Sequence, residues 1–560
     1  MKTKYIFPVL LALASCSKKG DITNPQINPP DNNGNGNGDG NSGETSGYSY
    51  KDWSNTTLDP SIDPTKPNII YIICDQMFVD KIHAMNATGP MGGATVNTPN
   101  LDYLLGQAHY FSHAYCAFPL SVPSRFSIFT GANSAEYGIV NNSNSSADQI
   151  AGIGRIPQNE RLGYLFQNAG YNTVYGGKTH LPGGGNGAKA LVAMYGFTDY
   201  YSSDVRSQLG ISAASKIAEY AQKGKPFFLV ASFINPHDID FYDDAIGYAV
   251  TGEDAEGDAA GTVFGPIYDA AAAYATKDNY STSTAWQGIY PDTLFNMPIP
   301  KPNPVGNLSY HGNNGKNMPG VHPGFLTLDG SNNPVHPPAL PRDEVRFFFR
   351  QRAWIYDRLC EALDSDIGPI VNTIKTLGLL NNSIVIFTAD HGELNGAHEL
   401  ERKQAPFEEC QRVPFVWLGK GIKPGRDDIS VLQTGVDLTP TLCDFAGITT
   451  PSRCTGLSIK GLLTGTSSSL GRDYIFTDGP KWNQVVYQGR YKYTVIKPFN
   501  NSWFEFLVDL QTDPGELKNL YNDPASQAIK TQLQSILFAD LRRRGLEVPG
   551  ESVSIYYKAP

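Results

Sequence analysis

The sequence predicts an α/β fold, in which a mainly parallel sheet is flanked by helices and followed by a smaller C-terminal subdomain with an antiparallel sheet. Two observations support this prediction. Continuous apolar runs alternate with helical patterns over most of the chain, and short strand-like segments follow one another near the C-terminus. The chain has 560 residues, of which 40% are hydrophobic and 18% are charged, so it can bury a large core.

The apolar runs cover residues 69–74, 226–233 and 383–388. Runs without a polar face are typical of strands that are buried on both sides, as in a parallel sheet. A helical pattern over residues 343–377, which ends at Gly378, precedes the last run. The alternation of strand and helix predicts parallel pairing with helices on both faces.

Polar residues directly follow each run, namely Asp75-Gln76, Asn235-Pro236-His237 and Asp390-His391. In open α/β sheets, ligands bind beyond the carboxyl ends of the strands. The sequence therefore predicts a functional site at this edge of the sheet.

Residues 66–455 are predicted to form the main domain and residues 456–560 the C-terminal α+β subdomain. The subdomain has predicted strands at residues 474–477, 484–487, 491–495 and 504–509 and a predicted helix near residues 526–544. Between about residues 240 and 341 the pattern breaks into Gly, Pro, Asn and Tyr. Irregular segments of this length are usually functional, so we expect an insertion that walls a substrate pocket.

The N-terminus predicts export. Its apolar run at residues 5–14 is typical of a secretory signal and is too short to span a bilayer. Leu13-Ala14-Ser15-Cys16 resembles the bacterial lipobox, so residues 1–16 are predicted to be a lipoprotein signal peptide that ends at a lipidated Cys16. A plain signal peptide with a chance Cys is the alternative. Residues 17–65, rich in Asn, Gly and Pro, would be a disordered spacer from the membrane, which predicts an exported bacterial lipoprotein in the periplasm or at the outer-membrane surface.

The net charge is -10 and no broad basic face is evident, so nucleic acid is not an expected partner. A local cluster of cationic side chains could still hold a small anion. Of the seven cysteines, Cys74 and Cys116 lie in apolar segments and are expected in the core. Export permits disulfides, and a bond between Cys443 and Cys454, the nearest pair, stays open.

The segment Ser121-Val122-Pro123-Ser124-Arg125 is followed by Thr130-Gly131. Its first five residues alone predict a helix start, with Pro at an early position and the Ser hydroxyl available as a cap. With Thr130-Gly131 added, the segment resembles the maturation motif of type I, formylglycine-dependent sulfatases, which is Cys or Ser-x-Pro-x-Arg with a downstream Thr-Gly. The chain is identified as a Ser-type member of that family, which implies the alkaline phosphatase-like fold.

The resemblance implies that an anaerobic radical SAM maturase oxidises Ser121 to formylglycine. The hydrated aldehyde carries two hydroxyls, of which one attacks sulfur while the other later collapses to the aldehyde and expels sulfate, so the nucleophile resets itself. A position at the start of a helix would also present backbone N–H groups to the anion.

The family places Ca²⁺ between residue pairs that match Asp75-Gln76 and Asp390-His391, so the implied ligands are Asp75, Gln76, Asp390, His391 and the oxidised Ser121. Oxygen-rich ligands suit a hard cation. Many members have a second Asp where this chain has Gln76, and His is an unusual neighbour of Ca²⁺, so the native metal stays open. For each pair alone, a turn or cap after a strand is the alternative.

Four further residues take roles from the resemblance. Gly177-Lys178-Thr179-His180-Leu181 resembles the family's Gly-Lys-x-His-Leu motif, in which Lys178 would hold a sulfate oxygen and His180 would contact the formylglycine hydroxyls and help to remove a proton. His237 would protonate the leaving oxygen, and Arg125 would stabilise the hydrate. A solvated lysine in a Gly-rich loop and a structural histidine after a strand are the alternatives.

Residues 396–414 also resemble a family segment, in which Lys403 would bind sulfate. His398 would either reach the sulfated substrate or only brace the loop, and both roles stay open. Glu408, Glu409 and Arg412 are expected to be structural.

These features imply a sulfatase that acts on a sulfated carbohydrate, such as a glycosaminoglycan, mucin or other host or algal glycan, because a lipid-anchored exoenzyme with a long pocket insertion suits extracellular glycan breakdown. A phosphodiesterase or phosphonate monoester hydrolase of the same superfamily is one alternative, since it shares the metal pairs. A noncatalytic glycan-binding surface lipoprotein is the other, and it predicts an unmodified Ser121 and no bound metal.

Overall fold

The computed structural model describes residues 65–85, 96–143, 145–183, 187–240, 327–328, 334–335, 342–399, 402–496 and 503–550. All of them belong to one compact unit, Tyr48–Pro560. The predicted signal peptide with Cys16, nearly all of the predicted spacer and most of the predicted insertion lie outside the described residues. None of the described helices is both long and apolar enough to cross a bilayer.

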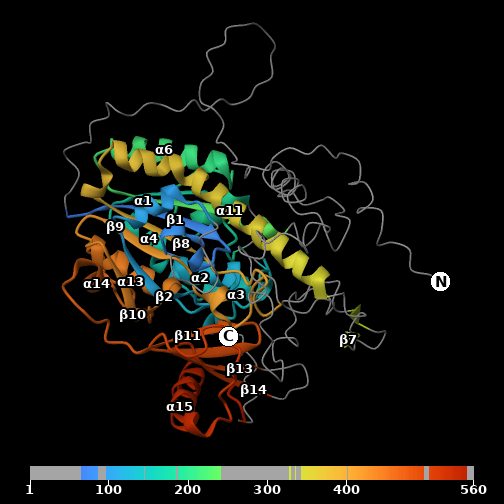
Figure 1. Cartoon of the computed structure of the whole chain (residues 1–560). Coiled ribbons are helices and arrows are strands. Elements are labelled where there is room, and N and C mark those ends of the chain that lie inside the picture. Colours follow the sequence, from blue (N-terminus) through green and yellow to red (C-terminus); the bar gives the residue numbers. More distant parts are fainter. Residues whose placement is uncertain are drawn as a thin grey trace, which may run out of the picture. The chain divides into compact units, whose positions relative to one another are not determined.

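An eight-stranded sheet forms the centre of the structure (Figure 1), with the strand order β10-β2-β9-β8-β1-β5-β3-β4. Its strands are β1 (Asn68–Asp75), β2 (His109–Tyr115), β3 (Asn172–Gly177), β4 (Asp199–Ser202), β5 (Phe227–Pro236), β8 (Ser383–Ala389), β9 (Phe415–Gly419) and β10 (Gly425–Gln433). All neighbouring strands pair in parallel except β9, which is antiparallel to β2 and β8. The predicted mainly parallel sheet is therefore confirmed.

Alternation along β1 assigns its side chains to two cores. Ile70 and Ile72 belong to the cluster that also holds residues of α1 (Pro99–Leu105), α6 (Ser207–Ala221) and α11 (Arg342–Thr376). Ile69 and Tyr71 belong to the other cluster, with α2 (Ser121–Thr130), α4 (Leu162–Asn168) and α13 (Thr434–Ala446). A strand buried on both sides needs apolar residues at every position, which is why its sequence is a continuous apolar run.

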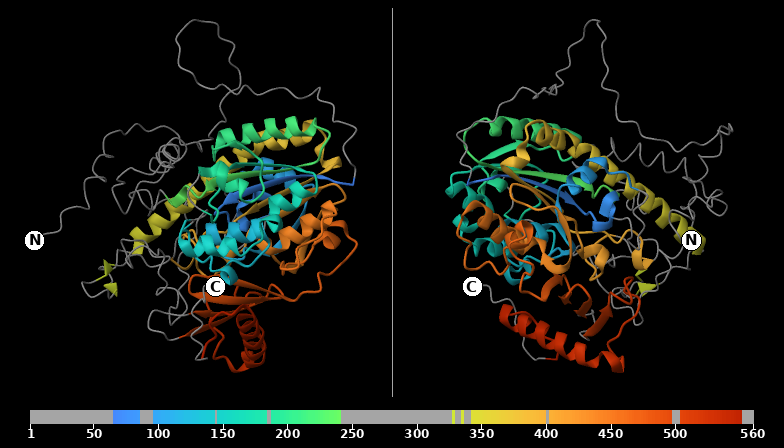
Figure 2. Two further views of the ribbon diagram at one scale, coloured as in Figure 1. Left: turned by 180° about the vertical axis from the view of Figure 1, so that it is seen from behind. Right: turned by 60° about the vertical axis from the view of Figure 1, so that its left-hand side comes forward.

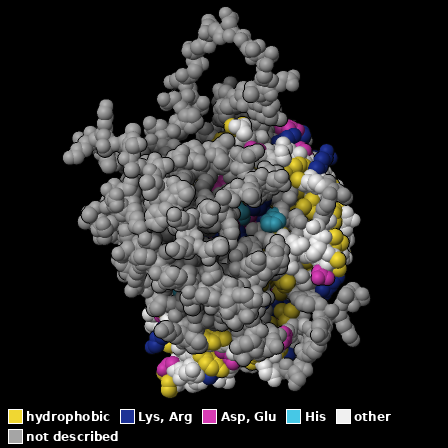
Figure 3. All heavy atoms as spheres, turned by 90° about the vertical axis from the view of Figure 1, so that its right-hand side faces the viewer, with side chains coloured by type: hydrophobic (Ala, Val, Ile, Leu, Met, Phe, Trp, Pro, Cys, Tyr) yellow, Lys and Arg dark blue, Asp and Glu magenta, His cyan; other side chains and the backbone are white. Residues whose placement is uncertain are grey.

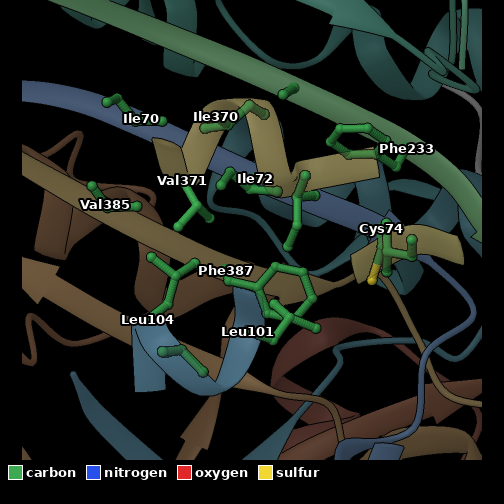
Figure 4. Packing of buried hydrophobic residues seen from close by; sticks show 14 of the residues in the cluster. Ile70, Ile72, Cys74, Leu101, Leu104, Phe233, Ile370, Val371, Val385 and Phe387 are labelled. Carbon is green, nitrogen blue, oxygen red and sulfur yellow. The ribbon is translucent and has the colours of Figure 1, made fainter. Parts of the chain in front are cut away.

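The first core is drawn in Figure 4, where Ile370 and Val371 of α11 and Leu101 and Leu104 of α1 surround the side chains of β1 and β8. Figure 2 shows the two helical layers from further directions. The long helix α11 confirms the predicted helix within one residue at each end, and Gly378 follows it with a φ of 59°, a left-handed conformation that favours glycine.

The C-terminal subdomain has an antiparallel sheet of β11 (Tyr474–Gly479), β12 (Trp482–Tyr487), β13 (Tyr491–Ile496) and β14 (Phe504–Asp509), followed by α15 (Gln527–Arg544). One face of the sheet packs on α15 through residues such as Val485, Val495 and Leu507. The opposite face packs on the loop around residues 394–410 of the main domain. The predicted strands and helix are confirmed.

The other α-helices and strands among the described residues are α3 (Ala147–Gly154), α5 (Gly187–Ala193), α12 (Glu408–Gln411), α14 (Lys460–Thr464), β6 (Thr327–Leu328) and β7 (Pro334–Val335). Cys74 and Cys116 are fully buried, as predicted. Cys443 and Cys454 carry free thiols, so the disulfide that the sequence left open does not form in this structure.

Candidate active site

The carboxyl ends of β1, β5 and β8 meet at one edge of the sheet. Cys74 of β1 pairs with Ala389 of β8, and Asp75 pairs with Pro236 of β5. The polar residues that follow the three strands therefore lie side by side, as the sequence predicts.

Ser121 is the first residue of α2 and is fully buried at this edge. Its Oγ lies 3.0 Å from Nε2 of His391 and 3.3 and 3.4 Å from the two carboxylate oxygens of Asp75. The hydroxyl does not cap its own helix, which corrects the capping interpretation of the isolated motif. Asn142 takes that role instead, because its Oδ1 accepts the N–H of Val122 at 3.1 Å.

Arg125 lies one helical turn after Ser121 and connects the strand ends. Its guanidinium donates to Asp390 at 2.8 Å, to Asp75 at 3.1 Å and to Oγ of Ser232 at 2.7 Å. Burial opposes the charge of Arg125, but the two carboxylates outweigh burial and raise its pKa. Arg125 is therefore a permanent positive charge beneath Ser121.

Asp75, Asp390 and His391 form a group whose ligand atoms all lie within 4.8 Å of one another, and all three side chains are fully buried. Burial and the neighbouring Asp75 raise the pKa of Asp390. Burial lowers the pKa of His391, and its Nδ1 lies 2.9 Å from the Gly392 carbonyl, so Nε2 faces Ser121 as an acceptor. Two close carboxylates, a neutral imidazole and the oxygen of residue 121 are donors that fit a divalent cation.

Gln76 is beside this group, but its side chain is engaged elsewhere. Its amide nitrogen donates to Asp240 at 2.9 Å and to Glu393 at 2.5 Å, and its amide oxygen accepts from Lys403. The predicted role of Gln76 as a metal ligand stays a prediction.

Both predicted sulfate-binding lysines reach the end of β1. Nζ of Lys178 lies 3.2 Å from Asp75, and Nζ of Lys403 contacts Gln76 and lies 3.4 Å from Asp240. Figure 3 shows histidine and lysine or arginine side chains that are visible together on one face of the molecule. An anion that entered this part of the site would meet two ammonium groups.

The two predicted proton-transfer histidines share this environment. Burial and the Lys178 ammonium lower the pKa of His180 to about 3. Burial, Lys178 and Lys403 lower the pKa of His237 well below its ordinary value. Both imidazoles are therefore neutral near pH 7 when no anion is bound.

Asp240 and Glu393 belong to this network, although sequence reasoning gave them no role. Asp240 connects Gln76, Lys403 and His237, whose Nε2 lies 3.6 Å from its carboxylate. Glu393 holds Gln76 and also pairs with Arg352 at 2.9 Å. The only signal in the sequence is that each acid lies close behind a predicted site residue.

His398 lies in a second buried group, with Glu409 and Glu516. Its ring stacks on Phe407 at 3.7 Å between centroids, and Nε2 is 3.9 Å from Glu409. This geometry favours the bracing role that the sequence left open. Here Lys492 supplies the positive charge, because its Nζ lies 2.7 Å from Glu516 and 3.0 Å from Glu408.

The fold is that of the alkaline phosphatase-like class, and the buried site lies at the carboxyl edge of its main sheet. The model of the sulfatase family matches residues 67–448, and a model described as "N-sulphoglucosamine sulphohydrolase, C-terminal" matches residues 396–543. The chain therefore belongs to the sulfatase family, whose members hydrolyse sulfate esters, and it is a sulfatase.

Known relatives cover most of the chain. A Delta 4,5-hexuronate-2-O-sulfatase of Bacteroides thetaiotaomicron is 26% identical over 84% of this chain and 88% of its own length. The solved structure of a 2-O GAG sulfatase is 22% identical with a TM-score of 0.60 and covers 87% of this chain and 95% of its own. A phosphonate monoester hydrolase of Silicibacter pomeroyi is 18% identical with a TM-score of 0.58 and covers 86% and 96%. The two structural likenesses show the fold alone.

Proposed function

We propose that the chain removes sulfate from a sulfated saccharide, using a formylglycine made from Ser121 and a bound divalent cation, for which Ca²⁺ is the expected ion. The observation that carries the proposal is the position of Ser121 at the start of α2, within 3.4 Å of Asp75 and His391. Arg125 and Lys178 adjoin it, and Lys403 reaches the neighbouring Gln76. A serine that only capped a helix would not need these charged and polar side chains around it.

Asp75, Asp390, His391 and the oxygen of residue 121 would hold the cation, with Gln76 as a further candidate ligand. When bound, the cation supplies a Lewis acid that favours ionisation of the attacking hydroxyl. Arg125 pairs with Asp75 and Asp390 and holds both carboxylates in place, and we assign to it the stabilisation of the oxidised residue as well. Oxidation of Ser121 by a radical SAM maturase is part of the proposal.

Lys178 and Lys403 would bind the sulfate oxygens and compensate charge as the ester bond breaks; removal of one such group typically costs about 2–4 kcal/mol of transition-state stabilisation. Neutral His180 can accept a proton from residue 121. His237 needs a proton to act as the acid, and a bound sulfate would supply the favourable charge by offsetting Lys178 and Lys403. Lys178 and Lys403 thus have two roles: they bind the sulfate, and they keep His237 neutral while no sulfate is bound.

The substrate class rests on the relative from Bacteroides thetaiotaomicron, which is a hexuronate-2-O-sulfatase. Export and lipidation at Cys16, with attachment to the membrane and a place in the periplasm or at the outer-membrane surface, are the location that we propose. They would bring the enzyme to extracellular glycans.

Mass spectrometry of the peptide that contains Ser121, from protein made with an anaerobic maturase, tests the modification. Sulfate release from defined sulfated saccharides tests the activity. Matched phosphonate and phosphodiester substrates test the alternative, a phosphodiesterase or phosphonate monoester hydrolase. We expect a mass loss of about 2 Da at Ser121, set by the oxidation of an alcohol to an aldehyde, and a preference for sulfate esters.

Ser121→Ala is expected to abolish turnover without unfolding the protein, because it removes the only atom that can become the nucleophile. Ser127→Ala is the matched control, since Ser127 is buried in the same helix and its hydroxyl donates to the Pro123 carbonyl. Substantial sulfate release by Ser121→Ala, measured with the same saccharide, would overturn the proposed nucleophile.

A further inference from the structure

Lys403 lies in a loop with an unfavourable backbone. Its two neighbours, Arg402 and Gln404, have φ values of 68° and 80°. Residues with a Cβ rarely adopt this left-handed region, and such conformations persist only where surrounding contacts hold them. The direction of the Lys403 side chain therefore depends on what fixes this loop.

Hydrogen bonds hold the loop on both sides of Lys403. On one side, the Arg402 N–H donates to Glu393 at 2.6 Å and the Arg402 carbonyl accepts from the Leu394 N–H at 2.8 Å. On the other side, the Gln404 N–H donates to the Pro119 carbonyl at 3.1 Å, and Nε1 of Trp482 donates to the Gln404 carbonyl at 2.7 Å. The last contact comes from the C-terminal subdomain.

The indole ring of Trp482 is packed tightly between the C-terminal sheet and the loop. It begins β12 on the face of the C-terminal sheet that is turned towards the loop, and it is buried among apolar residues of that loop, Leu394, Ala397, Ala405 and Phe407. Its partner across the hairpin is Gly479, where an added Cβ would lie 2.1 Å from the indole ring. Glycine at this position leaves room for the ring and so permits its hydrogen bond.

Two further contacts with the C-terminal subdomain extend the support. Gln484 donates to the Pro406 carbonyl at 3.1 Å, and the N–H of Glu408 donates to Glu516 at 2.7 Å. The loop is therefore tied to the subdomain at three successive points after Lys403.

We propose that Trp482 is a positioning residue for Lys403, and that the C-terminal sheet thereby helps to position a sulfate-binding side chain. This inference rests on the proposed role of Lys403 in binding sulfate. Trp482 acts through the backbone of Gln404 and does not itself contact the sulfate.

The experiment is a double-mutant cycle of Trp482→Phe and Lys403→Ala. Trp482→Phe keeps an aromatic ring but removes the indole donor. The readouts are the dissociation constant of inorganic sulfate, measured by calorimetry, and kcat and KM for 4-nitrophenyl sulfate, at equal formylglycine content. Trp417→Phe is the control, because Trp417 is a fully buried tryptophan of the main sheet whose Nε1 has no hydrogen-bond partner in the described chain.

We expect Trp482→Phe to weaken sulfate binding and kcat/KM by about tenfold, the effect of one lost buried hydrogen bond. Lys403→Ala should weaken both further, and Trp482→Phe should add nothing in that background. Gly479→Ala, which displaces the ring without removing a donor, should reproduce the loss. The control should leave the sulfate dissociation constant unchanged even where it lowers the melting temperature.

Three results would overturn the inference. Equal losses from Trp482→Phe with and without Lys403 would mean that Trp482 acts independently of it. Unchanged sulfate binding in Trp482→Phe and Gly479→Ala would mean that the contact does not position Lys403. No effect of Lys403→Ala would refute the proposed role of Lys403 itself, and this inference would fall with it. The Lys403→Ala result therefore distinguishes a failure of the proposed function from a failure of the Trp482 inference alone.

Discussion

At the scale of the residue, the candidate site is a balance between buried charges of opposite sign. Asp75 illustrates this, because burial raises its pKa but Lys178, His237 and Arg125 outweigh burial and lower it well below the ordinary range. Together with burial and Lys403, Lys178 also acts against protonation of His237. A bound anionic substrate adds negative charge to this balance and so favours protonation of His237. Sulfate binding and protonation of the general acid are thereby linked.

His237→Ala should lower kcat for an alkyl sulfate by about 10²–10⁴-fold, the usual contribution of a general acid, and should affect 4-nitrophenyl sulfate far less because nitrophenolate leaves without a proton. A general acid acts only while it is protonated, and the pKa of His237 is lowered in the enzyme without substrate, so kcat/KM for the alkyl sulfate should fall with rising pH from acidic pH upwards. This fall should be missing in His237→Ala. His83→Ala, at an exposed histidine, is the control. Equal losses on both esters in steady-state assays would contradict the role.

Residue types and motif order were enough to predict which side chains gather around Ser121, since each follows a strand or lies in a family motif. They were not enough for Asp240, which is separated from Gln76 and Lys403 by 164 and 163 residues. Nothing in a lone acid three positions after His237 distinguishes it from a surface residue. Only the fold brings the three together.

At the scale of the element, the strands that could be predicted are those whose signal is local. β1, β5 and β8 are buried along their whole length and carry long apolar runs because both faces are covered. β4 has four half-buried residues, and β10 is exposed over much of its length at the sheet edge, so neither has a continuous apolar run. The loop-facing side of the C-terminal sheet includes Gln484 and Lys492. Their partners include Pro406 and Glu408 of the main domain, which cannot be inferred from strand periodicity.

The start of α2 depends on a cap from outside the helix. Asn142→Ala removes the acceptor of the Val122 N–H and should lower the free energy of unfolding by about 1 kcal/mol, as for other helix caps. Asn142→Asp keeps an acceptor, so it should retain stability, but its negative charge next to Ser121 should weaken binding of the anionic substrate. Urea unfolding and KM measured together test this pair. Loss of stability in Asn142→Asp equal to that in Asn142→Ala would contradict the capping role.

At the scale of the whole molecule, the group of Asp75, Asp390 and His391 joins β1 to β8, and Arg125 joins both to α2. A cation bound there would stabilise the folded chain, since the unfolded chain does not hold these residues together. At a free cation concentration of 100 times the dissociation constant, binding raises the free energy of unfolding by about 2.7 kcal/mol.

Chelation should therefore lower both activity and melting temperature, and Ca²⁺ should restore both. Asp390→Asn should abolish most of the Ca²⁺-dependent shift in scanning fluorimetry, whereas Asp364→Asn, in a carboxylate that contacts α1 instead, should retain it. A shift of equal size in Asp390→Asn would mean that the stabilising ion binds elsewhere, because removal of one of two close carboxylates cannot leave the affinity of this group unchanged.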